Sequence, residues 1–373
     1  MCACGRGIIF AETSPKLEDV NAVLSKEAFV IEQDSTTVAF ENDGTNTRES
    51  TGRIRIQSDA GLQRYGVVQF SYQNSNQSLD IAYVRVRKPD GSIITSPADN
   101  IQDMVAAITR EAPVYTDLRE KHVAVKGLSV GDILEYQARW HTTKPEVPGQ
   151  FWFMYNFSHD SIILEEKLQI SVPAQRPVKW NGGSPKPNVV EKSGRRIFTW
   201  TTSQLQHKSS EQEKTEQETN TYRALRGQLP SPEVQLSSFD NWEEIGRWYG
   251  DLQKERVTAT PEIRSKAEEL TRNAKDEDPK LRAIYSYVST QFRYIGIAFG
   301  TGRYQPHSAA EVLSNQYGDC KDKHTLLASL LGAVGISAYP ALISSSHEID
   351  SDVPSPAQFD HVITAVRRGT DFL

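Results

Sequence analysis

Residues 317–336 read YGDCKDKHTLLASLLGAVGI, and this stretch decides how the second half of the chain folds. A glycine and an aspartate come directly before Cys320, and the residues after it have the apolar spacing of a helix. Gly318 permits a left-handed turn, and Asp319 is a residue type favoured at a helix N-cap. The sequence therefore predicts that Cys320 lies in the first turn of a helix with one buried apolar face.

A cysteine in the first turn of a helix is well placed to act as a nucleophile. The unpaired amide N–H groups there favour a thiolate over a thiol, and they can stabilise an oxyanion that forms on an attacked acyl group. The alternative is a small buried residue that packs the start of the helix. The polar neighbours Lys321, Asp322 and Lys323 argue against an apolar environment, so we favour a nucleophilic Cys320.

A thiol nucleophile needs a base, and His361 is the best placed of the eight histidines. It lies in QFDHVITAV, a predicted strand that places Phe359, His361, Ile363 and Ala365 on one interior face. A core histidine bonded to a backbone carbonyl would explain this pattern if Cys320 were absent. With a cysteine at a helix start in the same domain, a Cys–His pair is the better hypothesis.

Two other histidines are weaker candidates. His324 lies on the same predicted helix as Cys320, so it could be a rival base or, together with Cys320 and His361, a metal ligand. A base on the helix of the nucleophile has little freedom to approach the substrate, and no carboxylate lies at ligand spacing. His307 is expected in a solvent-exposed loop. We therefore predict no metal site.

The first half of the chain has a different period. From residue 25 to 206, apolar and polar residues alternate, as in RIRIQ (53–57) and KLQISV (167–172). This alternation is typical of strands with one buried face. Many short strands separated by turn residues predict an antiparallel, sandwich-like β domain.

These patterns divide the chain into four parts. Residues 1–24 form an N-terminal segment that could be the remnant of an export signal, and residues 25–206 form the β-rich domain. Residues 207–239 are expected to be a polar linker. Residues 240–373 have helical apolar spacing followed by two predicted strands, which indicates an α+β domain and makes the protein multidomain.

Composition excludes several classes of protein. Lys plus Arg is 42 against 48 for Asp plus Glu, a formal charge of −6, so without a long basic run no nucleic-acid partner is expected. No apolar run reaches the ~18 residues of a membrane helix, and the mean hydropathy is −0.53, so no integral membrane segment is expected. Three cysteines cannot form a disulfide framework.

Residues 294–327, YIGIAFGTGRYQPHSAAEVLSNQYGDCKDKHTLL, and the later FDHVITAV resemble the bacterial transglutaminase-like superfamily. The closest resemblance is to the subgroup in which an uncharacterised β-rich domain, here about residues 25–225, precedes the core. It implies a papain-like Cys-His-Asp arrangement with Cys320 as nucleophile and His361 as base, acting on protein or peptide amides by acyl transfer or hydrolysis. It implies no cofactor, and it favours a bacterial periplasmic or secreted location.

The resemblance also raises two questions about the site. Such folds supply a second oxyanion donor upstream of the cysteine, for which Tyr304 and Gln305 are the candidates. The third member of the family's triad is an aspartate on the strand after His361, but Asp371 is the only acid there, and it lies beside a predicted hairpin turn. We therefore expect this chain to be a C-terminally incomplete version of a longer protein, with weakened activity.

The sequence leaves three functions open. The leading one is thiol-dependent acyl transfer or hydrolysis on protein or peptide amides through an acyl-enzyme on Cys320. The second is a non-catalytic module that binds a protein or an envelope polymer and contains a degenerate core. The third is a zinc-dependent hydrolase. The identity of the substrate and the oligomeric state are not fixed by the sequence.

Overall fold

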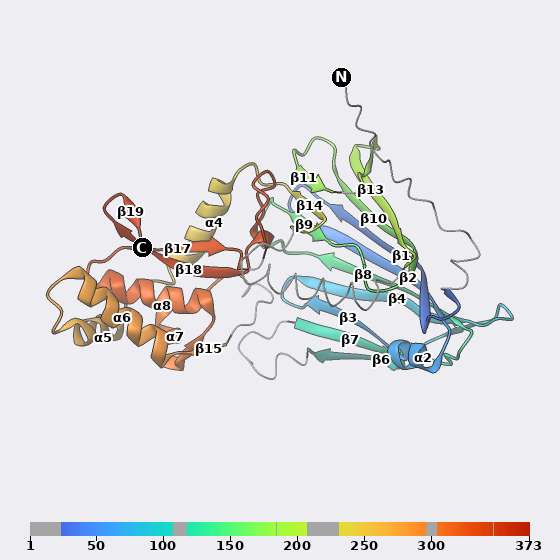
Figure 1. Ribbon diagram of the computed structural model, residues 1–373, viewed down its shortest axis with the longest axis horizontal. Coiled ribbons are helices and arrows are strands. Elements are labelled where there is room, and N and C mark those ends of the chain that lie inside the picture. The colour runs from blue at the N-terminus through green and yellow to red at the C-terminus, as the bar shows by residue number, and fades with distance from the viewer. Residues whose placement is uncertain (1–23, 107–117, 184, 207–230, 296–303, 346) are drawn as a thin grey trace, which may run out of the picture.

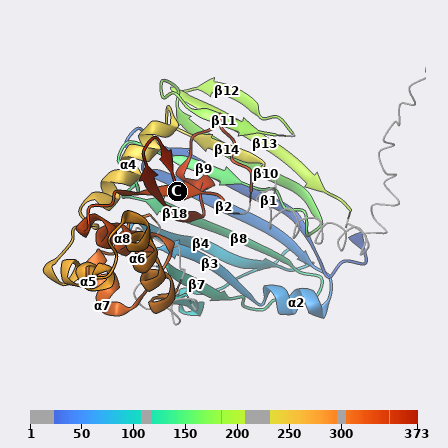
Figure 2. The ribbon, with the colours of Figure 1, turned by 60° about the vertical axis from the view of Figure 1, so that its left-hand side comes forward.

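The computed structural model describes residues 24–106, 118–183, 185–206, 231–295, 304–345 and 347–373. Figures 1 and 2 show a β-rich N-terminal part and, beside one end of its large sheet, a C-terminal part of helices and short strands. The predictions for residues 1–23, and for residues 207–230 of the expected linker, lie outside the described residues.

A single large sheet dominates the N-terminal part and contains eight strands. In spatial order they are β12 (Asn188–Lys192), β13 (Arg195–Gln204), β10 (Ile163–Pro173), β1 (Phe29–Phe40), β2 (Asn46–Ile56), β8 (Ile133–Thr142), β4 (Gln77–Arg87) and β5 (Ile93–Thr95).

The large sheet is mixed rather than wholly antiparallel, which corrects one detail of the sequence prediction. β1 pairs with β10 in parallel, with Val38 opposite Ile170, while the other pairs in the sheet are antiparallel. The alternation of apolar and polar residues is set by which face is buried, and it is the same for both strand directions. The expectation of a β-rich domain is confirmed.

Two three-stranded sheets cover the apolar face of the large sheet. One consists of β11 (Lys179–Gly182), β14 (Val234–Ser237) and β9 (Trp152–Tyr155), and the other of β3 (Val67–Gln73), β7 (Leu118–Ala124) and β6 (Ile101–Val105), with helix α2 (Asp59–Tyr65) and a 3-10 turn at Ala98–Asn100 nearby. Buried residues such as Leu168 and Ile170 pack against the first small sheet, and Ile54 and Leu134 against the second. The domain is therefore sandwich-like, as expected.

Strand β14 lies inside the range expected to be a polar linker. It pairs with β9 and β11, and Val234 and Leu236 are fully buried in the core of the N-terminal domain. The four-residue strand is too short to give a recognisable period in the sequence, and its polar residues are buried as well.

The C-terminal part contains five described helices and two small sheets. The helices are α4 (Trp242–Lys254), α5 (Pro261–Thr271), α6 (Glu277–Gln291), α7 (Ala309–Asn315) and α8 (Cys320–Ala333), with a 3-10 turn at Pro356–Gln358. The strands are β15 (Arg293–Tyr294) paired with β16 (Tyr317–Gly318), and β17 (Ala338–Ile343), β18 (His361–Arg368) and β19 (Asp371–Phe372) in that order. The predicted α+β class is confirmed.

Helix α8 is the central element of the C-terminal part. Its residues Leu326, Leu330 and Leu331 are fully buried in a core that α5, α6 and α7 complete. Burial of an apolar side chain of this size contributes about 1.5–3 kcal/mol. The helix that begins with Cys320 is therefore packed on several sides, and this packing fixes the position of its first turn.

The two parts of the molecule share an aromatic contact. The ring of Trp152 on β9 lies 6.4 Å from the ring of Trp248 on α4 and 6.2 Å from that of Tyr304, measured between centroids. Trp248 and Tyr304 are themselves 5.1 Å apart. The N-terminal domain thus packs directly against residues that precede the cysteine helix.

A buried carboxylate joins the start of α8 to the loop before α7. Asp322 is 1% exposed, and its Oδ1 accepts the backbone N–H of His307 at 2.8 Å and contacts the His307 ring nitrogen Nδ1 at 3.2 Å. Its Oδ2 accepts the backbone N–H of Asp319 at 3.3 Å. His307 is half-buried here rather than in an exposed loop, so that expectation was wrong.

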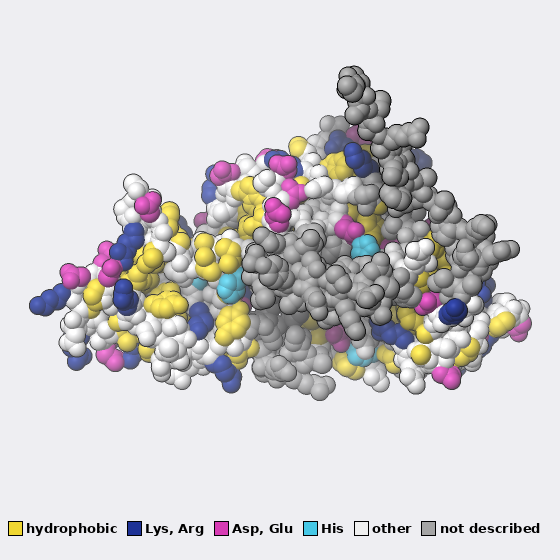
Figure 3. All heavy atoms as spheres, viewed as in Figure 1, with side chains coloured by type: hydrophobic (Ala, Val, Ile, Leu, Met, Phe, Trp, Pro, Cys, Tyr) yellow, Lys and Arg dark blue, Asp and Glu magenta, His cyan; other side chains and the backbone are white. Residues whose placement is uncertain are grey.

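The surface of the described residues carries charges of both signs. In Figure 3, basic and acidic side chains are interspersed among apolar ones on the visible face. Among the helices of the described residues, none combines the length and the apolar character needed to cross a membrane.

Gly52 on β2 provides a test of packing in the large sheet. A Cβ atom there would lie 2.2 Å from Cε1 of the Tyr136 ring, so Gly52→Ala is expected to lower the free energy of unfolding by about 1–3 kcal/mol. In α4, a Cβ on Gly246 would meet nothing, and Gly246→Ala is expected to stabilise by about 0.5–1 kcal/mol. Urea denaturation measures both changes, and equal stabilities for the two variants would contradict this packing.

The contact between His307 and Asp322 predicts a pH dependence of stability. The Asp322 carboxylate raises the pKa of His307 above its ordinary value of 6.5. The protonated imidazole therefore stabilises the fold below pH 6.5, and this contribution is lost as the pH rises through the folded-state pKa. We expect the unfolding free energy of the wild type to fall with rising pH in this range, and both His307→Gln and Asp322→Asn to reduce the slope. Unchanged slopes in both variants would show that the contact makes no such contribution.

Candidate active site

The turn that places Cys320 is fixed by a capping box. The side chain of Asp319 accepts the backbone N–H of Asp322, and the side chain of Asp322 accepts the N–H of Asp319, so each satisfies an N–H group that the helix leaves unpaired. Asp319 is thus the N-cap of α8, as predicted. Cys320 is the first residue of the helix, also as predicted.

Gly318 is needed in this turn for a reason other than the one expected. Its backbone is not left-handed; the left-handed residue is Gln316, with φ of 59°, at the C-cap of α7. A Cβ on Gly318 would instead lie 2.5 Å from Cβ of the buried Asp322. The glycine therefore allows the close approach of the chain to the carboxylate.

His361 is the first residue of β18 and lies opposite Ile343 of β17. The carboxylate of the preceding Asp360 accepts the backbone N–H of Ser345 at 2.7 Å and its hydroxyl at 3.0 Å, which fixes the chain where the strand begins. The predicted buried face was wrong: Val362 and Val366 are buried, because they face α8, and Ile363 is 46% exposed. His361 is half-buried at the start of the strand.

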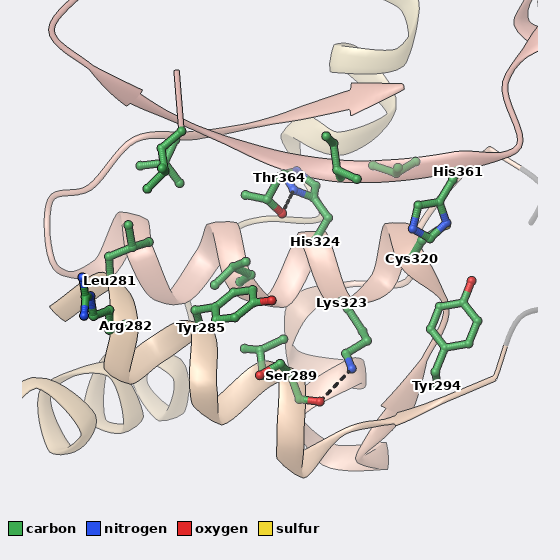
Figure 4. Close-up of a pocket in the computed structure, with 16 residues that line it drawn as sticks. Leu281, Arg282, Tyr285, Ser289, Tyr294, Cys320, Lys323, His324, His361 and Thr364 are labelled. Carbon is green, nitrogen blue, oxygen red and sulfur yellow. Dashed lines mark hydrogen bonds between the residues drawn. The ribbon is translucent and has the colours of Figure 1, made fainter. Parts of the chain in front are cut away.

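Cys320 and His361 nevertheless come together, because both line the same two cavities. The larger cavity, of about 660 Å³, lies between α6, α8 and β18 and is mainly apolar, with Tyr294 and Lys323 among its polar lining residues. The smaller, of about 220 Å³, has Tyr249, Tyr304 and Asp319 in its wall. Figure 4 shows the His361 imidazole directed at Cys320. The pair predicted from the sequence is therefore brought into one site.

The sulfur of Cys320 lies in an environment that opposes the expected thiolate. Burial raises the pKa of the Cys320 thiol, and the neighbouring Asp319 carboxylate raises it further. The backbone N–H groups of Val362 and Lys321 and the charge of Lys321 act in the opposite direction. Lys321 is itself buried and forms an ion pair with Asp319, which limits its effect on the sulfur. The resting cysteine is therefore a thiol at neutral pH.

Tyr294 is a site residue that the sequence analysis missed. Strand β15 pairs in parallel with β16, so Tyr294 lies opposite Gly318, and the N–H of Ile295 donates to the Gly318 carbonyl at 3.2 Å. The Tyr294 side chain lines the larger cavity together with Cys320, and burial, with the nearby Cys320 and Asp319, raises the pKa of Tyr294 to about 12. Tyr294 opens the YIGIAF segment, which indicates a strand but not which neighbour the tyrosine meets.

His324 has a different environment from His361. It is 3% exposed, its Nδ1 lies 2.8 Å from Oγ1 of Thr364, and burial lowers its pKa to about 4. Its imidazole is therefore neutral at physiological pH. Across the described residues, no three His, Cys, Asp or Glu side chains are grouped as metal ligands would be.

The two oxyanion candidates lie in different places. Tyr304 is 6% exposed and packs against Cys320 and Tyr249, in the wall of the smaller cavity. Its ring packs edge-on against the rings of both Trp152 and Trp248. Gln305 lines neither of the two cavities.

Asp371 is not close to His361. It pairs with Arg368 beside the hairpin turn at Gly369, at the opposite end of β18. The prediction that Asp371 lies too far along the strand to reach the imidazole is confirmed. In the described part of the chain, no carboxylate hydrogen-bonds to the His361 ring.

Comparison with known proteins identifies both parts of the chain. Residues 42–209 match a domain of unknown function for which a structure has been solved, DUF3857. Residues 264–351 match the transglutaminase-like superfamily. No curated protein matches.

Among solved structures, the fold is similar to that of a protein from Parabacteroides distasonis described as a putative protease. The TM-score is 0.72 at 21% sequence identity, and the match covers 91% of this chain and 65% of that protein. The chain thus spans less than two thirds of its relative's length, and at this identity the likeness concerns the fold. An M1 zinc metallopeptidase from Deinococcus radiodurans matches with a TM-score of only 0.28 at 9% identity, covering 47% of this chain and 39% of that one, and carries no argument.

The cysteine at the start of α8, with its preceding Gly-Asp turn, lies inside the second matched region, and the large mixed sheet lies mostly inside the first. The chain therefore consists of a DUF3857 domain followed by a core of the transglutaminase-like superfamily.

Proposed function

We propose that the protein is a thiol-dependent enzyme that transfers or hydrolyses acyl groups of protein or peptide amides, with Cys320 as nucleophile and His361 as base. The observation that carries the proposal is that these two side chains, from a helix start and a strand start, line the same two cavities. Transglutaminase-like membership is consistent with this chemistry.

The reaction begins with a neutral pair. Because the Cys320 thiol is protonated at rest, its proton passes to the His361 imidazole as the sulfur attacks the amide carbonyl carbon. The carbonyl π electrons move to the oxygen, which the backbone N–H of Cys320 at the helix start can stabilise. The C–N bond then breaks, and the leaving amine takes the proton from the imidazolium.

The acyl group is then held as a thioester on Cys320. A water molecule or an amine attacks the thioester, gives a proton to His361, and releases the acyl product with the free thiol. The two cavities meet at Cys320 and His361, so an acyl donor and an acceptor can approach from different sides. The larger cavity suits an apolar group next to the scissile amide, because its walls include Leu281, Leu327 and Val366.

Acylation by an activated ester tests this proposal. We expect p-nitrophenyl acetate to release p-nitrophenol in a burst and to add one acetyl group to Cys320, measured by absorbance and by mass spectrometry. Cys320→Ala is expected to abolish both signals, and His361→Gln to slow acylation by about 10²–10⁴-fold because the proton has no acceptor.

His324→Gln serves as the control for the base. Its imidazole is buried and hydrogen-bonded to Thr364, so we expect it to retain acylation close to the wild-type rate. If the acylation rate fell more in His324→Gln than in His361→Gln, the assignment of His361 as the base would be wrong. A wild-type protein with no acylation at Cys320 would contradict the enzyme proposal and favour the alternative of a binding module.

A further inference from the structure

A polar cavity in the N-terminal domain has no part in the proposed chemistry. Its volume is about 150 Å³, and it lies at the ends of β3 and β8, at the start of β4 and under the loop that leads into β9. Aromatic residues form part of its wall, and so do five amide side chains: Asn46, Gln73, Asn76, Gln77 and Gln150. Packing alone does not require a ring of amides, whereas recognition of a polar ligand does.

Asn76 gives the strongest indication that a ligand belongs in this cavity. It is 4% exposed, and its side-chain oxygen Oδ1 has no hydrogen-bond partner among the residues that the structure describes. Its backbone is fixed, because its N–H donates to the Gln73 carbonyl at 3.3 Å and its carbonyl accepts the N–H of Thr143 at 3.0 Å. A buried oxygen without a donor destabilises the protein. A ligand that places an O–H group at this oxygen removes that cost.

Two of the other amides are held in place by the protein itself. Oε1 of Gln77 accepts the backbone N–H of Gln73 at 3.1 Å, and its Nε2 donates to the Thr142 hydroxyl at 3.2 Å. Oε1 of Gln150 accepts a hydrogen bond from the Arg176 guanidinium at 2.8 Å. Polar groups that are already fixed lose little conformational entropy when a ligand binds. The lining is therefore prepared for a ligand of defined shape.

The composition of the lining selects the chemistry of that ligand. Among the described residues that line the cavity, Glu146 is the only charged one, so an anionic ligand is disfavoured. An amide side chain both donates and accepts hydrogen bonds, as a hydroxyl group does, so a polyol can pair with several amides at once. Phe151 and Trp152 supply an apolar wall for C–H groups. The volume corresponds to about five water molecules at ~30 Å³ each, which is room for one small ring.

We propose that this cavity binds a neutral sugar, as a single hexose ring. The hydroxyl groups of the ring pair with Asn76 and the neighbouring amides, and its C–H face packs against the aromatic wall. A peptide suits the cavity less well, because it offers one N–H and one C=O per residue and would leave most of the amides without a partner. Trp152 also packs against Trp248 and Tyr304, so the sugar binds beside the contact between the two parts of the molecule. The site does not depend on the reaction at Cys320.

Saturation-transfer difference NMR on the whole protein, with glucose, galactose and mannose as probes, tests this site. We expect at least one of the three to bind with a Kd on the order of 1 mM, as suits a ligand of about a dozen heavy atoms. The uronic acid of the same sugar is expected to bind about tenfold more weakly, because its carboxylate meets Glu146.

Asn76→Ala separates binding from folding. Since the amide oxygen is unpaired in the structure, its removal is expected to weaken binding about tenfold without lowering the midpoint of urea unfolding. Gln73→Ala removes a half-buried amide from the same cavity and is expected to weaken binding about fivefold, so the test remains decisive if Asn76→Ala does not fold.

Gln69→Ala is the matched control. Gln69 lies on β3 like Gln73, but it is exposed and does not line the cavity, so the wild-type Kd is expected. The proposal is refuted if none of the three hexoses binds, or if both Asn76→Ala and Gln73→Ala bind as the wild type does. It is also refuted if the uronic acid or the dipeptide glycylglycine binds more tightly than the hexose. None of these results bears on acylation of Cys320, so the proposed function is tested separately.

Discussion

The buried carboxylate of Asp322 is the constraint on which the geometry of the site depends. It accepts the backbone N–H groups of His307 and Asp319, so one side chain ties together the loop before α7 and the first turn of α8. A buried carboxylate is costly unless its oxygens are hydrogen-bonded, and here the backbone supplies the donors. Because Gly318 has no Cβ, the chain can approach Asp322 closely, and Cys320 follows at the first position of the helix.

The DUF3857 domain contributes to the surroundings of this site. Trp152 on its strand β9 packs against Trp248 and Tyr304, and Tyr304 lies in the wall of the smaller cavity beside Cys320. The loop before β18 also reaches the N-terminal domain, where Asp350 accepts a hydrogen bond from the Asn181 side chain. The domain that precedes the core therefore packs against the nucleophile's side of the core and contacts the loop that leads to the strand of His361.

Features with a strong local cause were predictable from the sequence. The alternation of apolar and polar residues around Ile54 and Leu168 predicted buried strands. The Gly-Asp-Cys turn predicted the N-cap at Asp319 and the position of Cys320 in the first turn of the helix. Features that depend on partners distant in the chain were not. The parallel pairing of β1 with β10, the buried strand β14 and the buried face of β18 are all set by what packs against them. Tyr294 belongs to this second group, since only its two-residue pairing with β16 brings it to the sulfur.

At Cys320, the surroundings of the side chain outweigh the local effect of the helix N-terminus on the pKa of the thiol. A helix N-terminus alone favours a thiolate, but that effect is confined to the first turn and is modest. At Cys320, burial and the Asp319 carboxylate act against it, and Lys321, which would favour the anion, is paired with Asp319. Burial keeps the sulfur protonated, and the same aspartate that caps the helix and fixes the sulfur adds to this effect. An arrangement of this kind requires the proton to move during attack, so the position of the His361 imidazole matters more for the proposed chemistry than the acidity of the resting thiol.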